Sequence, residues 1–194
     1  MSNATAARCV ASAGLLLALF AANARADTPA GAQMLDLKSG TLTYTLVHKL
    51  HEVRGSTSKL EGRALVQPDG TARVQVRAPV ASFESGNANR DAHMREVTHE
   101  LQHRYVSVKA TLSGLSLPLA REDQKTINAT VELNGERHEL PIQVTLTPDG
   151  SRVKAHLSFP ISLTAFKIDR PELLLIKSND DVKLEGDLVF EEAK

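Results

Sequence analysis

Apolar and polar residues alternate with a period of two along most of the chain after residue 40, which is the pattern of strands with one face in a core and one face in water. The alternation is clear in six segments: 42–46, 74–78, 106–112, 127–133, 140–146 and 153–159. Turn-forming residues separate the segments, among them Asn134-Gly135 and Pro148-Asp149-Gly150. Strands joined by such tight turns pair antiparallel.

This pattern predicts an all-β domain, a closed antiparallel barrel of about eight strands, because closure leaves no strand edge exposed. A β-sandwich has the same alternation and stays open as an alternative. The interior positions are mainly Val, Leu, Ile and Ala, and the chain has no Trp and few other aromatic residues. A barrel of this size either holds one ligand or is filled by its own side chains. The pattern leaves both interiors open.

One helix interrupts the strands, near residues 88–104. Its expected start is in the sequence ASFESGNANRDAHM, residues 81–94, where a strand gives way to a Gly/Asn turn. Asn87 or Asn89 can cap the helix, and Asp91 puts negative charge in its first turn, where the helix dipole favours it. We expect Arg90 and Asp91 to pair as a structural clamp that also orients His93, with ligand contact as the alternative role.

The N-terminus has the features of a secretory signal peptide. Arg8 is followed by an apolar run over 13–22 and by the cleavage pattern Ala24-Arg25-Ala26. We therefore expect a signal peptide over 1–26 and one barrel domain over 27–194. The apolar run is shorter than the roughly 20 residues that span a bilayer, and no later segment is longer. Cleavage would also remove Cys9, which leaves no cysteine for a disulfide.

Composition excludes several classes of function. The chain has 23 basic and 23 acidic residues without a contiguous basic stripe, so we expect no nucleic-acid partner. It has no Gly-x-Ser-x-Gly elbow for a serine nucleophile. Its glycines are dispersed among strands and turns, so no phosphate-binding loop precedes a helix. We expect no cofactor and no enzymatic activity.

The sequence His99-Glu100-Leu101-Gln102-His103 fits H-E-x-x-H, the helical spacing that puts two imidazoles on one face for Zn²⁺. A zinc hydrolase needs a third protein ligand. The metzincin continuation would have Gly and His where this chain has Val106 and Lys109. We therefore expect a solvated helix face and no metal, with Leu101 on the buried side. A zinc-dependent hydrolase that uses His99, Glu100 and His103 is the alternative.

Several segments resemble the YceI-like family of periplasmic, lipocalin-like proteins that bind polyisoprenoids and other long amphiphiles. Residues 82–94 fit the family signature S-x-x-[ST]-G-N-x-x-R-D-x-H-[LM]. The family's hairpins and C-terminal pattern are matched by four further pieces: 44–48 with 53–55, 131–135 with 139–142, 159–168, and 181–190. The resemblance covers nearly the whole chain after the signal peptide. It implies a lipocalin-like barrel in the periplasm.

The strand parity and the resemblance together indicate where a ligand would bind. The candidate ligand-binding residues are Tyr44, Leu46, His48, Val76, His93, Val131, Val144 and Leu157. We expect a periplasmic carrier for a long-chain isoprenoid or fatty amphiphile, such as a polyisoprenoid or an isoprenoid quinone. A solid-core barrel that acts through its surface is a further alternative. The sequence leaves open whether two copies pair as a homodimer.

Overall fold

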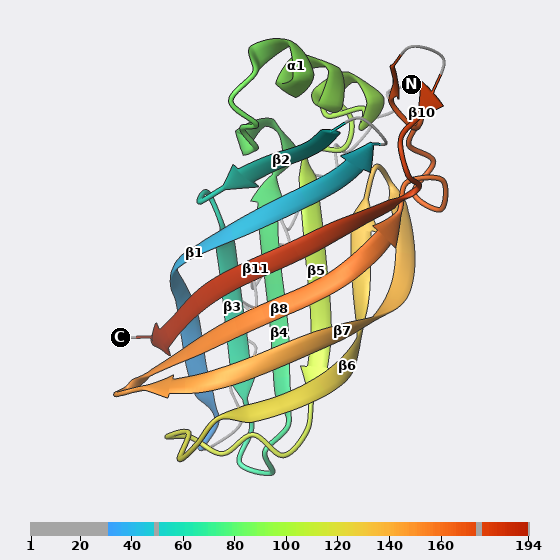
Figure 1. Ribbon diagram of the computed structural model, residues 1–194. Coiled ribbons are helices and arrows are strands. Elements are labelled where there is room, and N and C mark those ends of the chain that lie inside the picture. Colours follow the sequence, from blue (N-terminus) through green and yellow to red (C-terminus); the bar gives the residue numbers. More distant parts are fainter. Residues whose placement is uncertain (1–30, 49–50, 174–175, 194) are drawn as a thin grey trace, which may run out of the picture.

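The structure is a computed structural model that describes residues 31–48, 51–173 and 176–193. Its strands wrap into a barrel, and one helix lies across an end of it (Figure 1). The expected signal peptide, residues 1–26, lies outside the described residues. The elements are β1 Gln33–His48, β2 His51–Thr57, β3 Glu61–Val66, β4 Ala72–Pro79, the 3₁₀ turn η1 Val80–Ser82, α1 Ala88–Val97, β5 Tyr105–Leu112, β6 Asp123–Leu133, β7 Glu136–Asp149, β8 Arg152–Ser162, β9 Glu172–Leu173, β10 Ile176–Lys177 and β11 Asp181–Glu192.

The barrel closes through β1 and β11. The order β1-β3-β4-β5-β6-β7-β8-β11 follows the chain, each strand is antiparallel to the next, and β11 returns to pair with β1 from Leu35↔Glu192 to Leu46↔Val182. Within the described ranges, eight strands complete this ring. The predicted closed barrel of about eight strands is therefore confirmed. The sandwich alternative is excluded because the sheet has no break between two layers.

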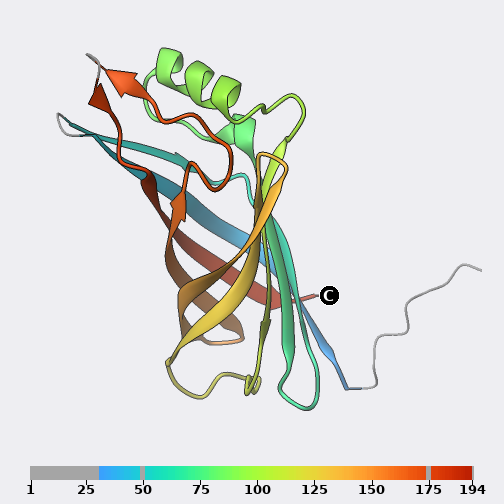
Figure 2. The ribbon, with the colours of Figure 1, turned by 90° about the vertical axis from the view of Figure 1, so that its right-hand side faces the viewer.

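β2 stands outside this ring and shares one side of β1 with β3. It pairs with the second half of β1, from Leu42↔Thr57 to His48↔His51, whereas β3 pairs with Gln33–Asp36 at the beginning of β1. Besides its pairing with β1, β2 forms one described isolated β-bridge, between Ser56 and Glu84, which lies outside the named strands. α1 lies beside β2 over this end of the barrel (Figures 1 and 2). The helix therefore covers the end where the strands diverge.

The alternating pattern buries one face of each strand. In β8, Val153, Ala155, Phe159 and Ile161 are buried, and the residues between them lie on the outer side or are partly covered. Each large apolar side chain buried in this way stabilises the fold by about 1.5–3 kcal/mol before the loss of chain entropy is counted. The hairpin between β6 and β7 turns through Asn134-Gly135, both with positive φ, as a two-residue turn that matches the strand twist requires.

α1 is shorter than predicted. Asn87 caps its start, since its side chain accepts hydrogen bonds from the backbone N–H groups of Asn89 and Arg90. The helix ends at Val97 because His99 adopts the left-handed conformation with φ 47°. Leu101 then lies in the following turn and is 83% exposed, so its predicted burial on a helix face is wrong. No described helix is long and apolar enough to cross a membrane.

Candidate functional site

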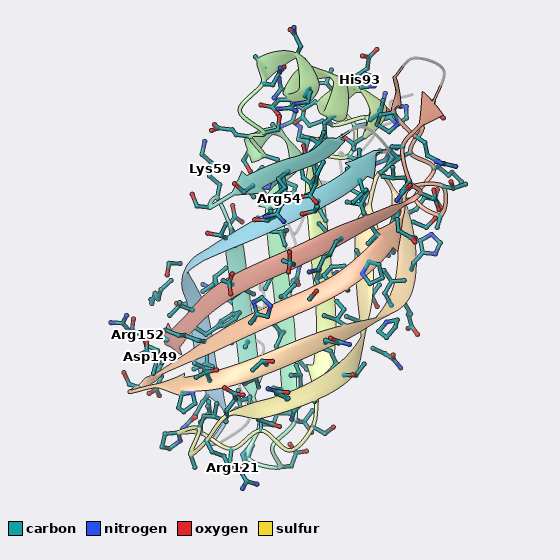
Figure 3. The ribbon with its side chains drawn as sticks, in the orientation of Figure 1. Arg54, Lys59, His93, Arg121, Asp149 and Arg152 are labelled. Atoms are coloured by element: carbon teal, nitrogen blue, oxygen red, sulfur yellow. The ribbon has the colours of Figure 1, made fainter. Side chains whose placement is uncertain are left out.

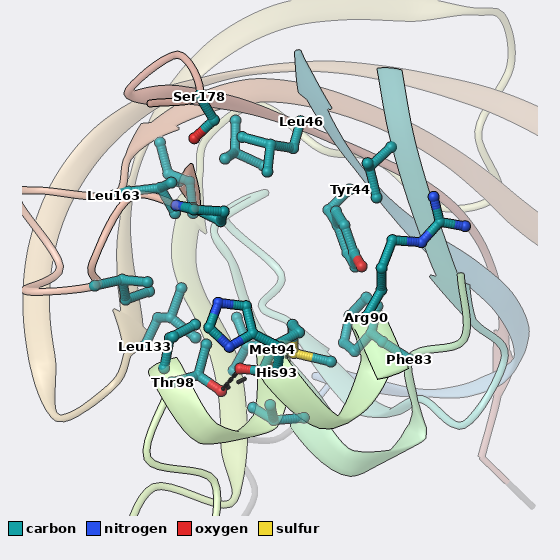
Figure 4. Close-up of a pocket in the computed structure, with 18 of the residues that line it drawn as sticks. Tyr44, Leu46, Phe83, Arg90, His93, Met94, Thr98, Leu133, Leu163 and Ser178 are labelled. Atoms are coloured by element: carbon teal, nitrogen blue, oxygen red, sulfur yellow. Dashed lines mark hydrogen bonds between the residues drawn. The ribbon is translucent and has the colours of Figure 1, made fainter. Parts of the chain in front are cut away.

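A cavity of about 280 Å³, which we call the upper cavity, lies inside the barrel end that α1 covers (Figure 4). Most of its lining is aliphatic or aromatic and comes from β1, β2, α1, β5, β6, β8 and β11. The polar side chains that line it are Tyr44, Arg90, His93, Thr98 and Ser178. A concave apolar space with a few polar groups is the usual form of a small-molecule site.

Tyr44 supplies the phenol of the upper cavity. Its ring packs at a tilt against Phe83, with ring centroids 5.9 Å apart, and both residues line the cavity. Burial, and secondarily the negative charge of Asp91, raise the pKa of Tyr44, while Arg90 acts in the opposite direction. The hydroxyl therefore remains a neutral hydrogen-bond donor at ordinary pH.

The first turn of α1 is anchored through Ser85. The buried carboxylate of Asp91 accepts a hydrogen bond from the Ser85 backbone N–H at 2.9 Å, and Nη2 of Arg90 donates to the Ser85 carbonyl at 3.1 Å. The expected direct ion pair between Arg90 and Asp91 is not formed among the described residues. Both side chains instead hold the same backbone unit, because neighbouring positions on a helix do not face each other.

The side of α1 that faces the barrel carries His93, Met94 and Val97. The imidazole of His93 lines the upper cavity and keeps 55% of its side-chain surface exposed, with a carboxylate oxygen of Glu96 3.7 Å from Nδ1. One turn later the hydroxyl of Thr98 donates to the Met94 carbonyl at 2.7 Å (Figure 4). His93 therefore lies between the cavity and solvent, at the mouth.

The end of α1 is anchored through Asn134, which is 7% exposed. Its Nδ2 donates to the carbonyls of Phe166 and Lys167, and its Oδ1 accepts from Nδ1 of His99 at 2.9 Å. His99, Asn134 and Lys167 are the described non-glycine residues with positive φ. Three left-handed turns from distant parts of the chain thus meet at one amide side chain.

The two histidines of the H-E-x-x-H sequence have structural contacts near the end of α1. His99 lies in a left-handed turn and its Nδ1 is bound to Asn134, so the predicted helix face for His99 and His103 is wrong. His103 instead packs against Gly135, where an added Cβ would lie 2.6 Å from the ring. Over the residues that the structure describes, no group of three His, Cys, Asp or Glu side chains is placed to hold a metal.

A second, smaller cavity of about 100 Å³, the lower cavity, lies toward the other end of the barrel. Val76, Val144 and Leu157, three of the predicted ligand-binding residues, line it, and Val106 borders both cavities. Tyr44, Leu46 and His93 line the upper cavity. The predicted ligand-binding residues are thus divided between the two cavities.

Val131 and His48 remain of the predicted ligand-binding residues. Val131 is fully buried and lies on the inner face of β6, but it lines neither cavity, which departs from its predicted role as a ligand contact. His48 ends β1, and its side chain lies outside the described part of the structure.

Several lining residues escaped the sequence analysis. Val53 could have been found from strand parity, since it is paired with Leu46 across the first hairpin. Phe83 follows a 3₁₀ turn and Thr98 caps a helix, so neither belongs to an alternating run. The turn sequence Asn134-Gly135 predicts a turn role for Asn134 and not its burial. The sequence around Asn134 carries no signal of its three side-chain partners, His99, Phe166 and Lys167, each more than 30 residues away.

The comparisons with known proteins agree with this architecture. The family model of the YceI-like domain matches residues 34–190. No curated protein matches the chain. Among solved structures, a polyisoprenoid-binding domain from Saccharophagus degradans implicated in plant cell wall breakdown has a TM-score of 0.66 at 14% identity, over 82% of this chain and 98% of that one.

Two more structures have the same fold. BcnA from Burkholderia cenocepacia has a TM-score of 0.64 at 15% identity, over 77% of this chain and 95% of that one. A YceI protein from Campylobacter jejuni has a TM-score of 0.59 at 14% identity, over 76% of this chain and 88% of that one. At these identities the likeness shows the fold and not the ligand.

Proposed function

Since this chain belongs to the YceI-like domain family, we propose that it binds and carries an amphiphile with one apolar tail, prenyl or acyl, without catalysing a reaction on it. The observation that carries the proposal is the upper cavity, a space of about 280 Å³ with a largely apolar wall and polar groups at its mouth. The relative from Saccharophagus degradans, described as polyisoprenoid-binding, supports the same class of ligand.

The physical basis is burial of the tail. Each methylene that leaves water contributes about 0.8 kcal/mol, so a tail supplies affinity with little demand on the shape of the wall. An apolar cavity of ~150 Å³ holds a benzene molecule, so the upper cavity has room for roughly a dozen carbon atoms. A polyisoprenoid or an isoprenoid quinone would place one end there and would need the lower cavity, or the outside of the mouth, for the rest.

The cellular location is part of the proposal. The signal-like sequence over 1–26 supports export and a carrier role in the periplasm. Intact-mass measurement on protein isolated from the periplasm tests this, because a chain that begins at Asp27 is expected. A mass that includes Met1, or protein found in the cytoplasm alone, would remove this part.

Native mass spectrometry of protein purified without detergent tests the binding role. We expect an added mass that organic extraction removes and that titration with a prenyl or acyl amphiphile restores. A matched variant is Leu46→Phe, which fills the upper cavity and should lower the retained amount. A bound Zn²⁺ would favour the hydrolase alternative, and bare mass with no uptake on titration would favour a solid-core barrel.

A further inference from the structure

Arg90 is the one permanently charged side chain among the described residues that line the upper cavity, and its charge is positive. Arg90 and His93 are its ionisable lining residues besides the phenol of Tyr44, and no carboxylate is among the described lining residues. Both come from the first two turns of α1. Figure 4 shows Arg90 beside Tyr44 on one side of the space, with His93 extending from the helix on another.

The positive charge of Arg90 is not neutralised by the contacts that the structure describes. Its described hydrogen bond goes to the Ser85 carbonyl at 3.1 Å, and within the described residues no carboxylate oxygen lies within 4.0 Å of its guanidinium. A carbonyl accepts a hydrogen bond but carries no net charge. A guanidinium has five N–H donors, so most remain available to another acceptor.

The two acidic residues of α1 make no described ion pair with Arg90, although the charge of Asp91 acts on Tyr44 against that of Arg90. Asp91 is buried, and its carboxylate is directed to the backbone N–H of Ser85. Glu96 lies near His93 on an exposed part of the helix and does not line the cavity. The neutral hydroxyl of Tyr44 adds a hydrogen-bond donor at the same place.

We infer that the amphiphile carried here has an anionic head, a carboxylate or a phosphate, which Arg90 binds at the mouth with Tyr44 and His93 while the tail lies in the upper cavity. The inference rests on the proposed function and narrows it. Fatty acids and prenyl phosphates fit this arrangement, whereas neutral quinones and free alcohols leave the Arg90 charge without a partner. Charge-assisted hydrogen bonds of this kind are about twice as strong as neutral ones.

The test compares ligands with one tail and different heads. Delipidated protein is titrated with decanoate, decyl phosphate and decanol by calorimetry at low salt. We expect both anions to bind at least about tenfold more tightly than decanol, the size of effect that one hydrogen bond to a charged group supplies. The stronger of the two anions then identifies carboxylate or phosphate as the preferred head.

Variants connect this preference to one side chain. Arg90→Gln should remove most of the advantage of the anions and leave decanol binding unchanged, and Arg90→Lys should keep much of it. The matched control is Arg54→Gln, because Arg54 lies on the outer face of β2 at the same end and pairs with Glu52 at 2.6 Å (Figure 3). This control should bind all three ligands as the parent protein does.

The outcomes are distinguishable. Equal binding of decanol and the anions by the parent protein would overturn the anionic head and leave the proposed function intact. Binding of none of the three would overturn the proposed function itself. Loss of decanol binding in Arg90→Gln would show that Arg90 shapes the cavity and does not recognise a head, and an equal loss in Arg54→Gln would show general surface attraction.

Discussion

The phenol ring of Tyr44 lies directly over Gly55, the residue opposite it on β2. A Cβ atom on Gly55 would stand 2.4 Å from Cε1 of the ring and 2.6 Å from its hydroxyl oxygen, closer than carbon and oxygen atoms can approach. The missing side chain therefore lets the ring lie against the barrel wall. Gly55 keeps the upper cavity open although it contributes no side chain to it.

Gly55→Ala should close part of the upper cavity. The added methyl would push the ring of Tyr44 away from the wall into the space, so ligand capacity should fall, with a stability cost of about 1–3 kcal/mol if the ring is strained. Native mass spectrometry with decanol, whose neutral head does not need the anion-binding groups, measures the capacity, and urea denaturation measures the cost. Tyr44→Ala in the same chain should restore the capacity.

Gly186→Ala is the matched control for this prediction. Its Cβ would lie 3.1 Å from the side chain of Leu157, which lines the lower cavity. This contact is longer than the one between Gly55 and Tyr44, and the flexible leucine can move more easily than the tyrosine ring. Binding in the upper cavity should therefore be kept. Equal loss of binding in both variants would show that the ring of Tyr44 is not the cause.

Val131→Phe should destabilise the protein. Val131 is fully buried and borders neither cavity, so a phenyl ring would have no free space and should cost about 1–3 kcal/mol. Leu46→Phe places a ring of the same size on the wall of the upper cavity and should cost less while it reduces ligand binding. Denaturant midpoints of the two variants check the contrast. Equal stability would mean that open space also reaches Val131.

The sequence predicts the barrel well because its signal is local. Alternation places inward residues such as Val144 and Leu157 correctly, and a capping residue such as Asn87 marks the start of α1. The sequence does not predict the end of the helix, because His99 adopts a left-handed conformation that usually favours glycine. The hydrogen bond from His99 to the distant Asn134 compensates for this unfavourable conformation. Contacts of this kind depend on how turns meet in space and leave no periodic pattern.

The site was predicted only in part for the same reason. Strand parity predicts which side chains point inward but not which of them are tightly packed. It therefore predicts the same ligand-binding role for Val131 and Leu46. The sequence predicts a direct pair of Arg90 and Asp91, whereas in the structure both side chains bind the backbone of Ser85. Cavity shape is a result of packing, and it depends on glycines such as Gly55 that carry no hydrophobic signal.

Asn134 should be among the most sensitive polar positions. Asn134→Gly keeps the turn conformation but leaves the Phe166 and Lys167 carbonyls without their donor, which should cost about 1–3 kcal/mol. Asn134→Ala should cost about 1–2 kcal/mol more, because alanine disfavours the left-handed φ of 51°. Urea denaturation measures both. Two equally stable variants would contradict the strain argument.

His99 tests the other side of the same contact. His99→Ala loses the hydrogen bond to Asn134 and keeps an unfavourable backbone conformation, whereas His99→Gly loses the bond and relieves the backbone, so the glycine variant should be the more stable. Glu100→Gln should leave stability nearly unchanged. Stoichiometric zinc in the parent protein that disappears in His99→Ala would overturn this structural role.

Asp180 should make the stability depend on acid pH. The hydroxyls of Ser162 and Thr164, and the Thr164 backbone N–H, donate to its carboxylate and lower the pKa of Asp180. A depressed pKa in the fold contributes stability above the ordinary pKa near ~3.9, and this contribution is lost as the pH falls through the folded value. Asp180→Asn should therefore lower the melting temperature at pH 7 and have little effect at the lowest accessible pH. A difference that is independent of pH would contradict the role of the charge.

Affinity should rise with tail length and then level off. The upper cavity of about 280 Å³ holds roughly a dozen carbons on the benzene scale, and the lower cavity of about 100 Å³ is separated from it near Val106, which borders both. Dissociation constants are measured for alkanoates of increasing length. The binding free energy should become more favourable by about 0.8 kcal/mol per methylene up to that size and then stay constant. Val106→Ala should join the two spaces and move the plateau by a few carbons, at a cost in stability. A steady improvement to the longest tails in the parent protein would show that the two cavities already act as one tunnel.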